Sequence, residues 1–241
     1  MEMKRSKIFL SAIILLLAAT AAFAFIQDDN TFLSYRVDPK KQVIKLYWQD
    51  AHKQNFGSIQ NLKTAVEKEK KQLLFVTNGG MYKPGGSPVG LYIQNNATLS
   101  SLDTSSGSGN FYLKPNGVFY LTTDNTAAIC TTPEFKNNGK IKYATQSGPM
   151  LVINGQIHPA FKEGSPNKNI RNGVGILPDG AVLFVLSKQP VNFYDFANYF
   201  KKQGCMNALY LDGFVSRAYL PEKDWVQLDG EFGVMIGVTG K

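Results

Sequence analysis

Short apolar segments that end at turn residues recur along the whole chain, and this pattern constrains the fold more than any other feature. Residues 73–76, 151–153, 181–186 and 208–211 are apolar runs of strand length. The chain has 22 glycines and is 12% aromatic, a composition typical of strand-rich, turn-rich proteins. A helical bundle is therefore excluded. The chain also shows no repeat of roughly 20–50 residues, which excludes solenoids and propellers.

Only two helices are predicted. Residues 58–71 carry Ile59, Leu62 and Val66 at helical spacing, and a second helix is predicted between Asn192 and Gly204. Three hairpins are predicted, at residues 111–121, 151–157 and 173–186. Strands thus outnumber helices without βαβ alternation. We expect an α+β fold of one domain, residues 25–241, with strand-rich mixed sheets and a few helices.

Residues 1–24 have the features of a signal peptide. Lys4, Arg5 and Lys7 precede an apolar run over residues 8–24, which ends in the small-x-small pattern Ala22-Phe23-Ala24. The alternative is an uncleaved signal anchor, because the run is at the short limit of a membrane span. Cleavage would release an exported protein, periplasmic or secreted, with no stable membrane anchor.

The charged, histidine and cysteine residues exclude several classes of site. The net charge is +8, but the basic residues are scattered, so no nucleic acid partner is expected. Two histidines, His52 and His158, exclude a multi-histidine zinc site. Two cysteines exclude a disulfide-rich scaffold. Cys130 and Cys205 either form a disulfide after export or remain two buried thiols, and the sequence leaves both alternatives open.

Four segments share one arrangement, in which a polar residue stands beside glycine at the end of an apolar strand. They are Asn78-Gly79-Gly80, Ser147-Gly148-Pro149, Arg171-Asn172-Gly173 and Asp212-Gly213. Glycine at such a place lets the backbone turn sharply or lets a ligand approach closely. Each segment alone fits a structural turn better than a functional site. The four together predict a ligand site, and four structural turns remain the alternative.

In this order and spacing the four segments resemble the phosphodiester glycosidase family, over about residues 40–238. The resemblance implies an α+β domain that hydrolyses a sugar–phosphate diester at the glycosidic carbon. It implies that Asn78, Arg171 and Asp212 are catalytic. The substrate-binding residues that it implies are Gly79, Gly80, Tyr82, Ser147, Gly148, Gly213, Ser216 and Arg217. The chain differs from many members at Phe214 and Val215, which replace flexible, hydrogen-bonding positions.

The acidic residues also fit a phosphodiester substrate. An ordinary glycosidase needs two carboxyl groups, but only Asp212 directly follows an apolar strand beside a glycine. Glu163, the second candidate, fits an ordinary loop residue better. A departing phosphate monoester has its second pKa near ~6 and needs little protonation. We expect Arg171 to hold the phosphate, with N–H groups at Gly79-Gly80 and Gly148 as an anion nest, while Asp212 activates water or stabilises an oxocarbenium-like centre.

Other aromatic residues and His158 allow two interpretations each. Tyr82, Phe214 and Tyr219 either form a stacking wall for a sugar ring or pack in the core. His158 acts as an acid or base, or it is a loop histidine held by one hydrogen bond.

Two functions of different class follow. The first is an exported hydrolase that releases a sugar and a phosphate monoester from an anionic sugar-phosphate or glycan substrate. The alternative is a non-catalytic carbohydrate- or cell-wall-binding module on the same fold. No motif requires a cofactor. The metal requirement is unknown, because some relatives hold structural calcium but no EF-hand-like spacing occurs here.

Overall fold

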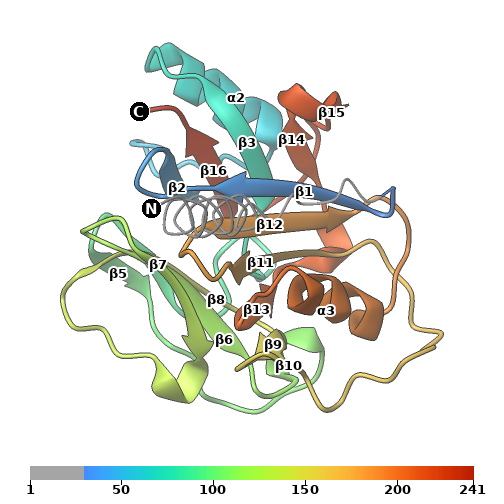
Figure 1. Cartoon of the computed structure of the whole chain (residues 1–241). Helices are drawn as coiled ribbons and strands as arrows, with labels where there is room; N and C mark the ends of the chain where they lie inside the picture. The colour runs from blue at the N-terminus through green and yellow to red at the C-terminus, as the bar shows by residue number, and fades with distance from the viewer. Residues whose placement is uncertain (1–29) are drawn as a thin grey trace, which may run out of the picture.

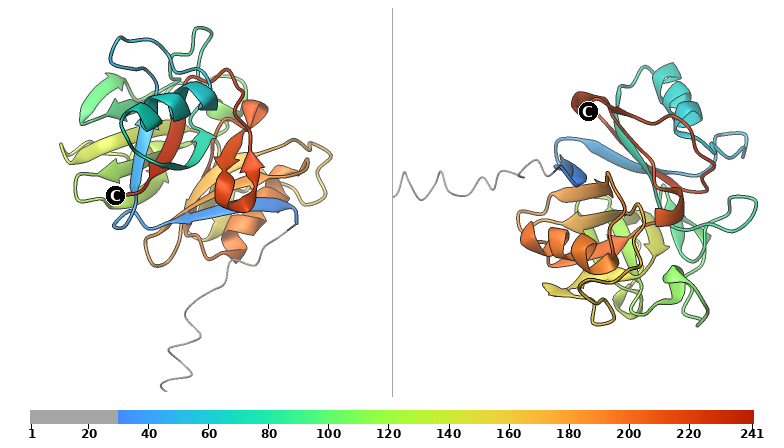
Figure 2. Two further views of the ribbon diagram at one scale, coloured as in Figure 1. Left: turned by 90° about the horizontal axis from the view of Figure 1, so that it is seen from above. Right: turned by 90° about the vertical axis from the view of Figure 1, so that its right-hand side faces the viewer.

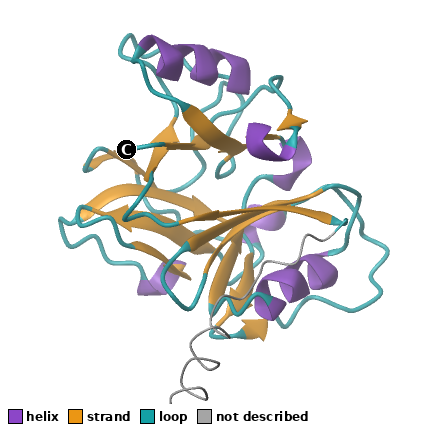
Figure 3. Cartoon of the chain, turned by 45° about the horizontal axis from the view of Figure 1, so that its top comes forward, coloured by secondary structure: helices purple, strands orange, loops and turns teal. Residues whose placement is uncertain are grey.

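The computed structural model describes residues 30–241 (Figure 1). The signal-peptide prediction for residues 1–24 lies outside the described residues. Strands dominate the described part (Figure 3), and two of its helices are α-helices. The predicted α+β class is confirmed. Within residues 30–241 no helix is long and apolar enough to cross a membrane.

Sheet A has six strands in the order β1-β12-β11-β13-β9-β10, and every pair is antiparallel. Its strands are β1 (Phe32–Val37), β9 (Met150–Ile153), β10 (Gln156–Ile157), β11 (Asn172–Ile176), β12 (Val182–Ser187) and β13 (Asn207–Tyr210). The predicted hairpins at residues 151–157 and 173–186 are confirmed as β9–β10 and β11–β12. Asn154 and Gly155, at the first turn, both have positive φ, 48° and 77°, as a tight two-residue hairpin requires.

Sheets B and C have five strands each. Sheet B has the order β15-β14-β3-β16-β2, with β2 (Val43–Tyr47), β3 (Leu73–Asn78), β14 (Ala218–Leu220), β15 (Trp225–Val226) and β16 (Met235–Thr239). Sheet C has the order β5-β4-β8-β6-β7, with β4 (Tyr92–Gln94), β5 (Ala97–Ser100), β6 (Gly117–Thr122), β7 (Ala127–Thr131) and β8 (Ile141–Ser147). Both are antiparallel throughout, so the described strands form no parallel pair.

The three sheets share one apolar core. Phe184 of sheet A, Phe75 of sheet B and Phe119 of sheet C meet there, with ring centroids 5.1 Å apart for Phe75–Phe184 and 6.2 Å for Phe119–Phe184. Burial of this shared surface is the main force that holds the sheets together. Residues 30–241 therefore fold around a common core, as one domain would.

Each α-helix covers the outer face of one sheet (Figures 1 and 2). Helix α2 (Ile59–Lys68) packs on β3, and Ser58 accepts the N-cap hydrogen bond from Asn61 N at 3.2 Å. Helix α3 (Phe193–Lys202) packs on β9 and β10, and Asn192 caps it through Asp195 N at 2.8 Å. Both helices begin where their capping residues predict. Four short 3-10 helices complete the described elements: η1 (Asn110–Tyr112), η2 (Thr132–Glu134), η3 (Gly213–Val215) and η4 (Pro221–Lys223).

The predicted hairpin at residues 111–121 is wrong. Residues 110–112 form η1, and β6 pairs instead with β7 and β8. The reason lies in the side chain of Asn116, which is buried and donates to the carbonyl of Phe111 at 3.0 Å. This bond folds the segment back on itself, so residues 111–113 cannot pair with β6.

The two cysteines are free thiols, so the disulfide hypothesis is wrong. Their side chains belong to different parts of the core. Cys205 is buried under α3 beside Phe200, whereas Cys130 lies opposite Val118 on the outer face of sheet C. Burial raises the pKa of Cys205 to about 12, and burial followed by the charge of Glu134 raises that of Cys130 to about 11.

Both thiols should therefore be unreactive in the native protein and fully reactive once it is unfolded. At neutral pH we expect an alkylating reagent, without reductant, to label almost none of the native protein because the thiolate is scarce. The same reagent in denaturant should label two cysteines by mass spectrometry. Absence of label in the denatured, unreduced protein would show a disulfide instead.

Candidate functional site

The segment that follows β13 is bonded to the other three motif segments. Three successive N–H groups donate to three different carbonyls: Tyr210 to Pro149 at 3.0 Å, Leu211 to Asn172 at 3.1 Å, and Asp212 to Gly79 at 3.1 Å. These acceptors lie in the segments that begin at Ser147, Arg171 and Asn78. The four segments, far apart in the sequence, therefore meet at one place.

Two buried amide side chains form the centre of this place. Asn172 donates to the carbonyl of Asn78 at 2.9 Å, to the Asn78 Oδ1 at 3.1 Å and to the Thr77 hydroxyl at 3.1 Å. Asn78 in turn donates to the carbonyl of Asp212 and accepts from the N–H of Arg217 at 3.0 Å. Both amides are 1% exposed. Asn78 therefore joins β3 to both ends of the loop that carries Asp212, which is a positioning role.

Asp212 is only half-buried, and its carboxylate acts electrostatically on two tyrosines. Burial, and then the charge of Asp212, raises the pKa of Tyr82. Burial also raises the pKa of Tyr210, where Arg171 opposes the shift and Asp212 adds to it. These effects show that the Asp212 carboxylate is within electrostatic range of both hydroxyls. Asp212 is thus an acidic group with access to solvent at the meeting point of the motifs.

Gly213 and Tyr210 fit against each other closely. A Cβ atom on Gly213 would lie 1.7 Å from the Tyr210 hydroxyl, and that hydroxyl accepts the N–H of Gly213. No residue other than glycine fits here. The close approach fixes the backbone directly after Asp212 and so restricts where the carboxylate points.

Arg171 is fully buried, at 1% exposure, and its guanidinium bonds to the protein. Its Nε donates to Val191 O at 2.8 Å, one terminal nitrogen donates to the Tyr210 hydroxyl at 3.3 Å, and the other donates to Asn167 at 3.0 and 3.2 Å. The guanidinium also stacks on Phe193, with its central carbon 3.6 Å from the ring centroid. Burial lowers the pKa of Arg171, and none of its hydrogen-bond partners among the described residues is a carboxylate. The guanidinium of Arg171 is therefore engaged by the protein, with the Tyr210 hydroxyl among its partners.

Ser216 and Arg217 complete the loop on its other side. The buried Ser216 hydroxyl donates to Gly213 O at 2.8 Å and contacts Asn172 Oδ1 at 3.4 Å. Arg217 keeps its side chain near the surface, where Nε bonds both oxygens of Asp229 at 3.1 Å. Arg217 is therefore a guanidinium of this loop that solvent reaches.

The glycines of the predicted anion nest have mainly a packing role. The N–H of Gly79 donates to Val234 O at 2.7 Å, so it is not available to an anion and that part of the nest prediction is wrong. A Cβ on Gly80 would lie 2.4 Å from the Thr145 hydroxyl, and one on Gly148 would lie 2.7 Å from Asn116. These glycines let the first two motif segments approach sheet C and residues 111–116.

Ser147 differs from its neighbours in having an unused polar group. Its side chain is fully buried at the end of β8, and its Oγ forms no hydrogen bond with any described residue. Because side chains alternate along a strand, it shares a face of β8 with Thr145, which contacts the Gly80 backbone. The hydroxyl is thus a donor and acceptor close to the motif cluster.

Sequence reasoning missed two residues of the site, Asn172 and Tyr210. Asn172 was visible as part of its motif, and successive residues on a strand point to opposite faces. That rule places Arg171 and Asn172 on different sides of β11, so only one of them could face β3. Tyr210 carried no signal, since an aromatic residue in an apolar strand usually belongs to the core.

His158 is a structural residue and lies outside the motif cluster. Its Nδ1 accepts from Ala160 N at 3.1 Å, its Nε2 contacts Lys114 O at 3.1 Å, and its ring stacks on Phe161. The interpretation as a hydrogen-bonded loop histidine is confirmed, with two bonds instead of one. Burial lowers its pKa from 6.5, against the opposite effect of Lys114 O.

We expect the neutral His158 to make the stability of the fold depend on pH. Because its folded pKa lies below the unfolded value, its contribution to stability is complete above about pH 6.5 and is lost as the pH falls toward the folded pKa. The melting temperature should drop between about pH 7.5 and 5.5, and less in His158→Gln. The exposed His52→Gln is the control and should show the wild-type drop. An unchanged drop in His158→Gln would exclude this role.

Of the remaining sequence candidates, the side chain of Phe214 lies outside the described part of the chain, and two others lie apart from the cluster. Glu163 is an exposed loop residue, and Tyr219 packs in the core between α2 and β3. Among residues 30–241 no group of three or more His, Cys, Asp or Glu side chains could hold a metal ion.

Comparisons with known proteins agree with the resemblance seen in the sequence. A family model described as phosphodiester glycosidase matches residues 71–233. The uncharacterized protein YigE of Escherichia coli (strain K12) is 40% identical over 217 residues, which are 89% of this chain and 85% of the relative.

Two solved structures share the fold at low sequence identity. One is the catalytic domain of zebrafish N-acetylglucosamine-1-phosphodiester alpha-N-acetylglucosaminidase, auto-inhibited by its pro-peptide, with 14% identity, TM-score 0.55, and 89% and 85% of the two chains covered. The other is a hypothetical protein from Synechocystis, with 12% identity, TM-score 0.52, and 87% and 59% covered. At these identities the likeness concerns the fold alone.

Proposed function

The chain belongs to the phosphodiester glycosidase family, and we propose that it is an exported hydrolase that cleaves a glycosyl-phosphate diester at the glycosidic bond. The observation that carries the proposal is the convergence of four motif segments on Asp212, through the N–H groups of residues 210–212. The zebrafish enzyme with the same fold is named for cleavage between a sugar and a phosphodiester.

In the proposed reaction water attacks the anomeric carbon and the bond between this carbon and the phosphate oxygen breaks. The half-buried Asp212 takes the proton from the attacking water or stabilises positive charge on the sugar ring. The leaving group is a phosphate monoester, whose second pKa near ~6 makes a general acid unnecessary. One carboxylate, that of Asp212, therefore suffices.

Other residues of the cluster bind and orient the substrate in this proposal. Arg217, which solvent reaches, attracts the diester phosphate, and the half-buried Tyr82 ring contacts the sugar. Asn78, Asn172 and Arg171 act through the backbone and Tyr210. They hold the Asp212 loop in place, because preorganised groups need no rearrangement during the reaction.

A panel of sugar-1-phosphate p-nitrophenyl diesters tests the reaction. With the mature protein we expect release of free sugar and p-nitrophenyl phosphate in equal amounts, separated by chromatography. Release of sugar 1-phosphate and p-nitrophenol would place cleavage at the other bond and contradict the proposal. Binding of the diesters without any release would favour the carbohydrate-binding alternative.

Export is part of the proposal and has its own test. If the signal peptide is cleaved after Ala24, the protein recovered from the periplasm or medium begins at Phe25 by mass spectrometry. Recovery of a chain that keeps Met1 in the membrane fraction would instead show a signal anchor.

A further inference from the structure

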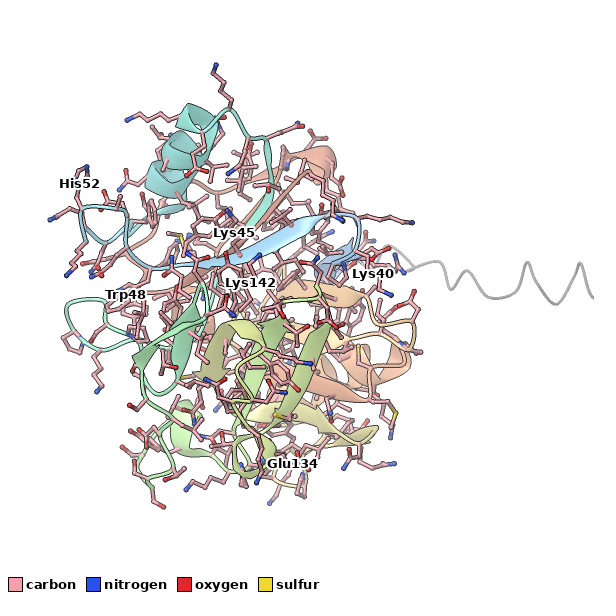
Figure 4. All side chains as sticks on the ribbon, turned by 90° about the vertical axis from the view of Figure 1, so that its left-hand side faces the viewer. Lys40, Lys45, Trp48, His52, Glu134 and Lys142 are labelled. Atoms are coloured by element: carbon pink, nitrogen blue, oxygen red, sulfur yellow. The ribbon has the colours of Figure 1, made fainter. Side chains whose placement is uncertain are left out.

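A hollow surface lies between helix α2, strand β2 and the loop of residues 48–57. Figure 4 shows Lys45 on β2 below this helix, with the loop that carries His52 projecting beside it. The surface consists of two cavities of about 240 and 430 Å³. Asp50, Phe56 and Ala65 line both cavities, so the two adjoin, and together they are here called the α2 groove. None of the predicted catalytic or substrate-binding residues lines it.

Amide side chains make up much of the polar lining of the α2 groove. They are Gln49, Gln54, Asn55, Asn61, Gln94 and Asn95. Three of them are each bonded at one end to a residue outside this set: Asn61 donates to Phe56 O at 2.8 Å, Gln94 accepts from the Tyr92 hydroxyl at 3.1 Å, and Asn95 accepts from the Tyr143 hydroxyl at 2.7 Å. Their other ends, Asn61 Oδ1, Gln94 Nε2 and Asn95 Nδ2, form no hydrogen bond with a described residue. The groove thus offers fixed donors and acceptors together, which suits hydroxyl groups because each can both donate and accept.

Aromatic side chains line the same groove. Tyr47 and Phe56 are half-buried and pack edge to face, with ring centroids 6.0 Å apart, and the buried Tyr143 lies beside them in the smaller cavity. Half-buried rings next to amides provide apolar surface with polar groups at its border. Sugar rings have this same division, with C–H groups on their faces and hydroxyls around their edges.

The side chains that line the α2 groove carry as many positive as negative formal charges. Its lining includes two lysines, Lys45 and Lys68, and two acids, Asp50 and Glu69. Both acids are already occupied: Asp50 accepts from the N–H groups of His52 and Gln54, and Glu69 pairs with Lys71. The lining itself has no net formal charge, and it is the amides and rings that suit an uncharged ligand.

We propose that the α2 groove binds an uncharged oligosaccharide, at a site separate from the motif cluster. The adjoining cavities give room for several sugar units in a row, with rings against Tyr47 and Phe56 and hydroxyls on the amides. The groove also contacts the loop that carries Tyr82, since Asn55 donates to Gly85 O at 2.9 Å. A glycan bound here lies beside this loop. The proposal does not depend on diester cleavage.

Isothermal titration calorimetry of the mature protein tests the site. The probes are hexasaccharides of glucose and of N-acetylglucosamine, with a uronic-acid hexasaccharide as the charged comparison. We expect one neutral hexasaccharide to bind with 1:1 stoichiometry. Asn61→Ala and Gln94→Ala, one in each cavity, should each raise its Kd by about fivefold, the effect of losing one hydrogen bond. The double variant should bind more weakly than either.

Two matched variants show whether binding is specific to the α2 groove. Gln156→Ala removes an exposed amide on sheet A and should leave the Kd unchanged, and Asp212→Asn should do the same because its site is separate. Melting curves check that all variants fold. Failure of both neutral hexasaccharides to bind, tighter binding of the acidic one, an unchanged Kd in Asn61→Ala and Gln94→Ala, or loss of binding in Asp212→Asn would each overturn the proposal.

Discussion

Replacement of Asp212 by asparagine should lower kcat for diester cleavage by about 10²–10⁴, the range found when a positioned proton-transfer group is lost. Asparagine keeps the shape of the side chain but removes the negative charge that faces Tyr82 and Tyr210. KM should change little, because the charge is needed in the transition state rather than for binding. Initial rates with the p-nitrophenyl diester that the wild type cleaves fastest measure both constants.

Asp179→Asn is the matched control for this experiment. Asp179 is an exposed carboxylate in the β11–β12 turn, at the opposite end of β11 from Asn172, and its ion pair with Arg36 is at the surface. We expect full activity and a change in stability below about 1 kcal/mol. If Asp212 only stabilises its turn, Asp212→Asn will instead lower the melting temperature and keep its activity per folded molecule. That outcome would remove Asp212 from the mechanism.

Local sequence signals predicted those parts of the fold that neighbouring residues determine. The N-caps Ser58 and Asn192 begin the two helices, and Asn154-Gly155 forms the turn of β9–β10. The hairpin predicted at residues 111–121 failed because a buried side chain, Asn116, bonds the backbone there. The sheet orders were not predictable, since β3 pairs with β14 and β16, which lie far along the chain.

The candidate site was predictable in its position and only partly in its roles. The four glycine segments meet as expected, because each lies at a strand end and residues 210–212 bond the other three. The role expected for Arg171 came from its charge alone. A guanidinium can bind a phosphate through two parallel hydrogen bonds, but it can equally donate hydrogen bonds to buried carbonyls. Only the packing of α3 shows which partners Arg171 has.

Arg171→Lys should therefore reduce stability strongly. Lysine keeps the charge but loses the planar fork, so the bonds to Val191 and Asn167 and the stacking on Phe193 cannot all be kept. We expect a loss of about 2–4 kcal/mol, which corresponds to a fall in melting temperature of roughly 5–15 °C for a chain of this size. Arg36→Lys, at an exposed surface ion pair, is the control and should change stability by less than about 1 kcal/mol.

The kinetics of Arg171→Lys then decide how this residue serves the site. If it acts through Tyr210, kcat per folded molecule falls while KM changes little, and Tyr210→Phe has a similar effect. The kcat of the double variant is then little lower than that of either single variant, because both substitutions remove the same support from the Gly213 backbone. Direct contact with the phosphate predicts a different result. KM would rise by more than about tenfold, and the effects of the two substitutions would add. A rise in KM of that kind would show that Arg171 reaches the substrate and would contradict the positioning role.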